Sequence, residues 1–204
     1  MSDASFHALL RSRLLAAPER PALELPGERV LARGELDAAA GRYATVLLGQ
    51  GARRGDRVAF QVEKSPEALL LYLACLRAGL IALPMNPAYQ EGEVAHILGD
   101  AEPAVYVGDP RWAERFGRHV PAVLSLDRDG HGSLADAAQG AAEAPPVPAA
   151  PSDIAAMLYT SGTTGRPKGA PLSHANLSSN AAVLVEAWEI TGRDVLLHAL
   201  PIFH

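Results

Sequence analysis

The chain has 204 residues, of which 49% are hydrophobic and 20% are charged, and its formal net charge is −5. This composition is typical of a folded globular protein and excludes global disorder. No basic stripe is visible, so nucleic acid is not an expected partner. No apolar run is long enough to span a membrane. With a single cysteine the chain cannot form an internal disulfide, which favours a cytoplasmic location.

Helices and strands are expected to alternate through the first part of the chain. A helix at 5–15 precedes a β-hairpin at 22–32. Ser65 followed by Pro66 is a favoured start for a nearly all-apolar, buried helix. The full set comprises helices at 34–51, 67–78, 92–100 and 111–117 and strands at 56–62, 80–87, 103–109 and 121–126. This order predicts an α/β fold with a mostly parallel sheet and flanking helices.

The composition changes at residue 127. Residues 127–152 are mostly alanine, proline and glycine, which predicts a surface loop or linker. We therefore divide the chain into an α/β part at 1–126, this linker, and a loop-bearing segment at 153–204. The elements expected in the last segment are strands at 153–160, 168–173 and 194–203 and a helix at 174–190 with Ser173 as its N-cap.

The segment 159–174 reads YTSGTTGRPKGAPLSH and suits the binding of a polyphosphate. Its glycines allow successive backbone N–H groups to point toward one anion and let phosphate oxygens approach the backbone. The hydroxyls of Ser161, Thr163 and Thr164 can donate to those oxygens. Lys168 adds a positive charge, and charge-assisted hydrogen bonds are the stronger ones.

The spacing in this loop excludes two common nucleotide-binding motifs. A Walker loop has four residues between its glycine and a Gly-Lys pair, with Ser or Thr after the lysine. Here Pro167 precedes Lys168 and Gly169 follows it, and the dinucleotide pattern G-x-G-x-x-G is absent as well. A flexible turn is the simple alternative, but a run with eight specified positions would arise by chance on the order of once in a billion positions.

The run S-G-T-T-G-x-P-K-G resembles the signature of the adenylate-forming superfamily, which includes acyl-CoA synthetases, luciferases and peptide-synthetase adenylation domains. The resemblance implies that a small-molecule carboxylate is activated by ATP to an acyl-adenylate and then transferred to coenzyme A. Mg²⁺ would accompany the ATP. By match to the signature, the residues that would bind the ATP phosphates are Thr160, Ser161, Gly162, Thr163, Thr164, Gly165 and Lys168.

Two more segments, 85–107 and 188–204, resemble parts of the same enzymes. His204 matches a family position, aromatic or histidine, that lines the acyl pocket. The segments 161–188 and 194–204 look most like malonyl-CoA synthetases, which implies malonate as the substrate. Alternatives are a fatty or aryl acyl-CoA ligase, an adenylation domain that loads a carrier protein, and a truncated fragment without enzymatic role.

The resemblance covers essentially the whole chain but less than half of the expected enzyme. The adenine and ribose motifs and the catalytic lysine of the family would lie beyond residue 204, and Lys168 is not that lysine. We therefore interpret the chain as the N-terminal part of the family's large domain, with an incomplete sheet and no activity by itself.

Three residues outside the motif have simpler expected roles. We expect Cys75 to be a packed thiol. His174 should make a local hydrogen bond. Trp188, together with Leu184 and Val185, should belong to the core.

Overall fold

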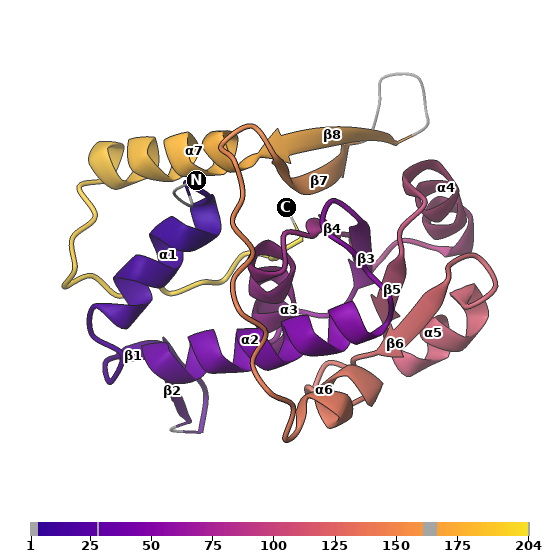
Figure 1. The fold of residues 1–204 in the computed structure, drawn as a ribbon, viewed down its shortest axis with the longest axis horizontal. Helices are drawn as coiled ribbons and strands as arrows, with labels where there is room; N and C mark the ends of the chain where they lie inside the picture. Colours follow the sequence, from indigo (N-terminus) through magenta and orange to yellow (C-terminus); the bar gives the residue numbers. More distant parts are fainter. Residues whose placement is uncertain (1–3, 28, 161–166, 204) are drawn as a thin grey trace.

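The computed structural model describes residues 4–27, 29–160 and 167–203. A six-stranded sheet with the order β6-β5-β3-β4-β7-β8 forms its centre (Figure 1). The first five strands in this order are parallel to their neighbours, and β8 is antiparallel to β7. The predicted α/β fold with a mostly parallel sheet is thus confirmed. The strands are β3 (Arg57–Gln61), β4 (Ile81–Pro84), β5 (Val105–Gly108), β6 (Ala122–Ser125), β7 (Ile154–Thr160) and β8 (Lys168–Ser173).

Helices cover both faces of the sheet. One face packs against α2 (Arg33–Gly49), α3 (Pro66–Arg77) and α6 (Ser133–Ala138), and the other packs against α4 (Glu91–Ala101) and α5 (Pro110–Phe116). Successive residues of β3 divide between the two cores: Val58 and Phe60 join the first, and Ala59 joins the second. This burial on both faces explains why the central strands are continuous apolar runs in the sequence.

The remaining elements flank this sheet. The predicted hairpin is confirmed as β1 (Pro21–Glu24) paired with β2 (Val30–Ala32). Helix α1 (Phe6–Leu15) lies beside α7 (His174–Ala187) (Figure 1). Both predicted N-caps are present, because Ser65 Oγ accepts a hydrogen bond from the Ala68 N–H at 3.1 Å and Ser173 Oγ accepts one from the Asn176 N–H at 3.2 Å.

Residues 127–152 contain α6 and then an extended stretch that runs across α2 and α3 (Figure 1). The backbone of this stretch bonds to both helices: the Ala144 N–H donates to the Gly41 carbonyl at 3.0 Å, and the Val147 N–H donates to the Arg77 carbonyl at 2.8 Å. Ala144 and Ala149 are buried. The division of the chain at residues 126 and 152 stays a prediction.

The end of the chain differs from the expectation. The predicted strand at 194–203 is wrong, since residues 195–203 form neither helix nor strand and Leu197 is 91% exposed. A strand forms only where a neighbour satisfies its backbone. Here Lys64 Nζ donates to the carbonyls of three successive residues at 3.0–3.2 Å, namely His198, Ala199 and Leu200.

The core assignment of the α7 residues is also wrong. Trp188 is 67% exposed and Val185 is 49% exposed, whereas Leu184 is half-buried. Helix α7 contacts α1, and its one residue described as buried is His174 in the first turn. The later apolar residues of α7 are therefore turned toward solvent.

Helix α3 confirms the expected burial of Cys75, which is fully inaccessible. Burial raises the pKa of the Cys75 thiol, because the thiolate would lose its hydration. Among the described helices, α3 included, none combines the length and apolarity that crossing a bilayer requires.

Cys75 therefore reports on opening of the core. We expect the folded chain to leave a disulfide reagent such as DTNB unreacted for as long as the native state persists, and to react at one equivalent once urea unfolds it. A stopped-flow absorbance trace measures both states. Rapid reaction of the folded chain at the rate of a free thiol would contradict the described packing of α3.

Candidate functional site

Strands β7 and β8 form an antiparallel hairpin whose connection carries the signature loop. In its register Thr160 pairs with Lys168, and Tyr159 pairs with Gly169. Directly opposed residues of an antiparallel pair project from the same face, and successive residues alternate between faces. The side chains of Thr160 and Lys168 therefore share one face of the hairpin, and Tyr159 lies on the other.

The structure thus brings together the two described members of the predicted phosphate site. Thr160 and Lys168 are both exposed, and each ends its strand where the loop begins. The other predicted members of the site lie outside the described residues, namely Ser161, Gly162, Thr163, Thr164 and Gly165, and so does His204, the predicted acyl-pocket residue.

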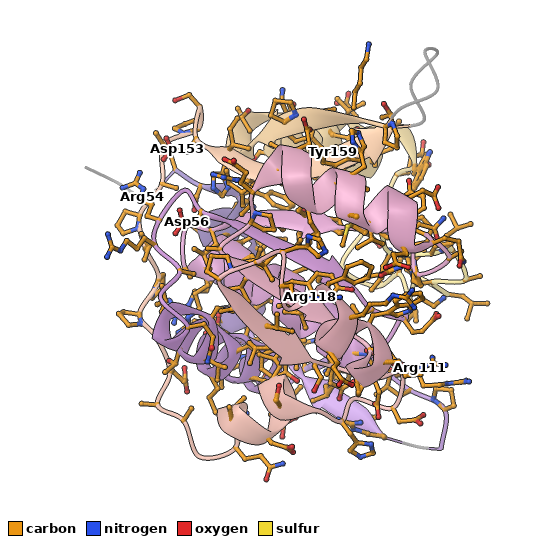
Figure 2. The ribbon with its side chains drawn as sticks, turned by 90° about the vertical axis from the view of Figure 1, so that its right-hand side faces the viewer. Arg54, Asp56, Arg111, Arg118, Asp153 and Tyr159 are labelled. Carbon is orange, nitrogen blue, oxygen red and sulfur yellow. The ribbon has the colours of Figure 1, made fainter. Side chains whose placement is uncertain are left out.

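Helix α4 contacts both arms of the hairpin. The Tyr159 hydroxyl donates to Asp100 Oδ2 at 2.5 Å, and His96 Nε2 donates to the Pro167 carbonyl at 3.2 Å. Figure 2 shows Tyr159 over the same side of the sheet as this helix. Burial, and then the Asp100 carboxylate, raise the pKa of Tyr159, so the phenol stays protonated and remains a donor.

Gly169 gives the Tyr159 ring its space. A Cβ at Gly169 would lie 3.2 Å from the Tyr159 ring carbon Cζ and 3.1 Å from the Met157 sulfur, closer than ordinary packing allows. Glycine at this position therefore leaves room for the ring against β8. Beside it is an open hollow of about 370 Å³ whose polar lining includes Arg57 and Asp100. The Arg57 guanidinium donates to two carbonyls at the C-terminal end of α4, those of Ala101 and of the C-cap residue Glu102.

Sequence reasoning did not identify these supporting residues. His96 and Asp100 are four residues apart, and that spacing places two side chains on one face of a helix. The spacing alone does not say what the face meets, because Tyr159 is 59 residues from Asp100 and Pro167 is 71 residues from His96.

The opposite end of the hairpin is a structural anchor. His174 is buried, its Nδ1 accepts a hydrogen bond from the Phe6 N–H at 3.2 Å, and its N–H donates to the Asp153 carbonyl at 3.0 Å. The hydrogen-bonding role expected for His174 is confirmed, but its side-chain partner is not local, because Phe6 is 168 residues away in the sequence. Asp153 also pairs with Arg54 at 2.7 Å (Figure 2). Strand β8 separates His174 from Lys168 by about 20 Å at the usual rise per residue.

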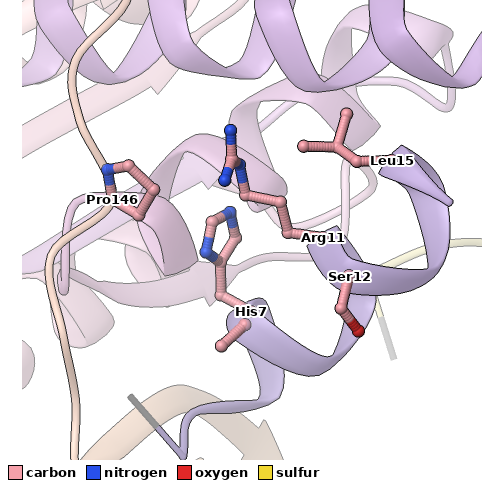
Figure 3. Close-up of a pocket in the computed structure, with 6 residues that line it drawn as sticks. His7, Arg11, Ser12, Leu15 and Pro146 are labelled. Atoms are coloured by element: carbon pink, nitrogen blue, oxygen red, sulfur yellow. The ribbon is translucent and has the colours of Figure 1, made fainter. Parts of the chain in front are cut away.

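A second hollow, of about 180 Å³, lies between α1 and the extended stretch and is lined by His7, Arg11, Ser12, Leu15 and Pro146 (Figure 3). No residue of the hairpin lines it. The Arg11 Nε donates to both Asp37 carboxylate oxygens at 3.1 Å, so this guanidinium serves the packing of α1 on α2.

The donor set at the open end of the hairpin fits phosphate. Thr160 supplies a hydroxyl and Lys168 an ammonium, and both can donate to the same anion because they share a face. Within residues 4–27, 29–160 and 167–203, no three His, Cys, Asp or Glu side chains gather as a metal site would require. The nearby Asp100 carboxylate is engaged by Tyr159.

Comparison with known proteins finds a matching family and similar solved structures. The model of the AMP-binding enzyme family matches residues 10–204. A crystal structure of apo MatB from Rhodopseudomonas palustris is 48% identical and covers all of this chain with a TM-score of 0.94. The ATP-bound form of that protein gives the same TM-score at 47% identity. Feruloyl-CoA synthase from Amycolatopsis sp is 35% identical over 178 residues, which are 87% of this chain.

These relatives are much longer than the matched region. The chain spans 41% of the solved MatB chain and 35% of the feruloyl-CoA synthase. The long-chain-fatty-acid–CoA ligase FadD13 of Mycobacterium tuberculosis, 34% identical over 203 residues, is likewise matched over 40% of its length.

Proposed function

The chain belongs to the AMP-binding enzyme family, and from this premise we propose that it supplies the ATP-phosphate hairpin of an AMP-forming acyl-CoA ligase. In this reaction a carboxylate oxygen attacks the α-phosphorus of ATP, the bond to the β-phosphate breaks, and pyrophosphate leaves. The thiol of coenzyme A then attacks the acyl carbon, AMP departs, and the thiol proton is released. Because the chain spans 41% of MatB, the activity belongs to a protein of the relatives' length.

The observation that carries this proposal is the pairing of Thr160 with Lys168 at the mouth of the signature loop. Negative charge accumulates on the departing pyrophosphate, and preorganised donors stabilise it. The loop residues Ser161, Gly162, Thr163, Thr164 and Gly165 complete the proposed donor set. Mg²⁺ would arrive with ATP, and no described residue is assigned to it.

We propose malonate as the carboxylate. Support comes from MatB, a malonyl-CoA synthetase and a 48% identical structural neighbour. A dicarboxylate needs a cation for its second carboxylate, most suitably an arginine. The fatty-acid and feruloyl ligases match at 34–35% identity, and they make a long-chain or an aryl acid the competing substrate class. His204 is proposed as part of the acyl pocket.

The test is ATP–pyrophosphate exchange in a chimera that joins this chain to the unmatched remainder of the Rhodopseudomonas palustris MatB chain. We expect exchange that depends on malonate. The 204-residue chain alone, measured in parallel, should give none. Exchange with octanoate or ferulate and none with malonate would overturn the substrate assignment, and exchange by the chain alone would overturn the proposal that it is inactive by itself.

A further inference from the structure

Helix α4 presents two polar side chains to the hairpin, and each bonds to an arm of it. Asp100 accepts the hydroxyl of Tyr159, the residue before Thr160. His96 donates to the carbonyl of Pro167, the residue before Lys168. Each hydrogen bond is therefore one residue away from a proposed phosphate ligand.

The helix is a firm base for these two contacts. Its apolar residues Val94, Ile97 and Leu98 are buried in the second core together with Ala59 and Leu83 of the sheet. Arg57 bonds to the carbonyls at its C-terminal end at 2.7 and 2.9 Å. A side chain fixed to such an element can hold its partner within the narrow geometry that a binding site requires.

The contact between Tyr159 and Asp100 approaches the hairpin from the face opposite to the phosphate ligands. Tyr159 and Thr160 are successive strand residues, so their side chains point to opposite faces. Strand β7 has only one residue pair, Ala156 with Ala82, in register with β4, whereas it is paired with β8 along its length. The sheet alone therefore fixes the outer end of the hairpin weakly.

We infer that α4 positions the phosphate hairpin, with Asp100 and His96 setting the direction in which Thr160 and Lys168 meet the ligand. The identity of the ligand in this inference rests on the proposed function. The positioning itself rests on the hydrogen bonds of Asp100 and His96 to the hairpin. Asp100, His96 and Tyr159 are positioning residues, because Tyr159 projects from the face opposite to Thr160 and the two α4 side chains bond to the hairpin itself.

The first experiment uses the 204-residue chain and inorganic tripolyphosphate as the probe, titrated by calorimetry. Removing a buried or charge-assisted hydrogen bond reduces binding by about five- to tenfold if the bond holds the ligands in place. We expect that loss for Tyr159→Phe, Asp100→Ala and His96→Ala. Asp100→Asn keeps an acceptor oxygen and should bind within twofold of the wild type.

The matched control is Glu91→Ala. Glu91 is a carboxylate on the same helix, but its partner is Arg115 of α5 rather than the hairpin. This variant should bind tripolyphosphate as the wild type does. Loss of binding in Glu91→Ala equal to that in Asp100→Ala would overturn the inference, since it would reflect general loosening of α4.

The second experiment measures amide hydrogen exchange of Gly169 and Ala170 by NMR and needs no ligand. Tyr159→Phe and Asp100→Ala should each accelerate exchange by about fivefold, and the double variant should do no more than either alone. Cys75 should stay unreactive toward DTNB in all three, which separates local loosening from global opening. Unchanged exchange, or additive effects, would overturn the inference.

The two experiments can contradict the phosphate role and the positioning role independently of each other. If the wild-type chain does not bind tripolyphosphate, the proposed phosphate role of the hairpin is contradicted, and the exchange measurement still decides whether α4 holds it. If the wild type binds and the variants bind equally well, the phosphate role stands and the positioning role falls. In the MatB chimera the positioning role further predicts a higher KM for ATP in Asp100→Ala with an unchanged KM for the carboxylate.

Discussion

Replacing Lys168 with alanine should slow adenylate formation by about 10²–10³-fold, the effect of removing one preorganised donor from developing negative charge. Lys168 is the first residue of β8 and lies directly opposite Thr160, so its ammonium and the threonine hydroxyl share a face of the hairpin. The measurement is malonate-dependent ATP–pyrophosphate exchange in the MatB chimera. The loss should appear mainly in kcat, because the charge that Lys168 meets grows as pyrophosphate departs.

Two variants serve as controls for Lys168→Ala. Lys168→Arg keeps the charge but changes the donor geometry, so it should retain part of the rate. Arg111→Ala removes an exposed cation on α5 that pairs with Asp109, two residues earlier in the chain, and it should exchange at the wild-type rate. Wild-type exchange in Lys168→Ala would refute the phosphate role, and an equal loss in Arg111→Ala would indicate a diffuse effect of net charge.

The sequence predicted the α/β architecture because its signals are local. Burial of β3 and β5 on both faces requires continuous apolar runs, and such runs occur at 58–60 and 104–107. The N-caps at Ser65 and Ser173 depend on a residue three positions away, and both form as predicted. The return strand at 168–173 is confirmed for the same reason, because a short hairpin pairs neighbours in the chain.

The supports of the site could not be predicted because they join distant residues. The signature motif indicates which groups can meet a phosphate. It carries no information on Asp100 or His96, whose partners are 59 and 71 residues away. The predicted strand at 194–203 failed for a related reason: its apolar residues favour pairing, but pairing depends on a neighbouring strand that the local sequence does not specify.

A buried ionic cluster is the other feature that the sequence concealed. Arg77 stands in the apolar run of α3, yet its side chain is only 3% exposed and its NH1 lies 3.1 Å from the Asp37 carboxylate. Its Nε donates to the Ala144 carbonyl at 2.7 Å. Gly41 makes room for it, since a Cβ there would lie 3.0 Å from the guanidinium carbon. The cluster therefore joins α2, α3 and the alanine- and proline-rich stretch.

Asp37→Ala should destabilise the folded chain by up to about 3–5 kcal/mol, the cost of breaking a buried ion pair. The buried Arg77 would keep the half-exposed Glu143 carboxylate, 3.5 Å from its NH2, as a weaker partner. Arg11, the second partner of Asp37, is 35% exposed and can return to water, but Arg77 cannot. Urea unfolding followed by circular dichroism measures the loss, and DTNB reaction at Cys75 should accelerate with it. If Asp37→Ala proves too unstable to purify, Asp37→Asn keeps an acceptor for Arg77 and should lose less.

Matched variants separate this effect from a general loss of ion pairs. Arg54→Ala breaks a shorter pair, 2.7 Å from Asp153, but its members are 56% and 38% exposed, so the cost should be below about 1 kcal/mol. The double variant Asp37→Leu with Arg77→Met removes both buried charges and should recover part of the stability lost by Asp37→Ala. Equal costs for Asp37→Ala and Arg54→Ala would mean that solvent reaches Arg77 and that burial does not set the strength of this cluster.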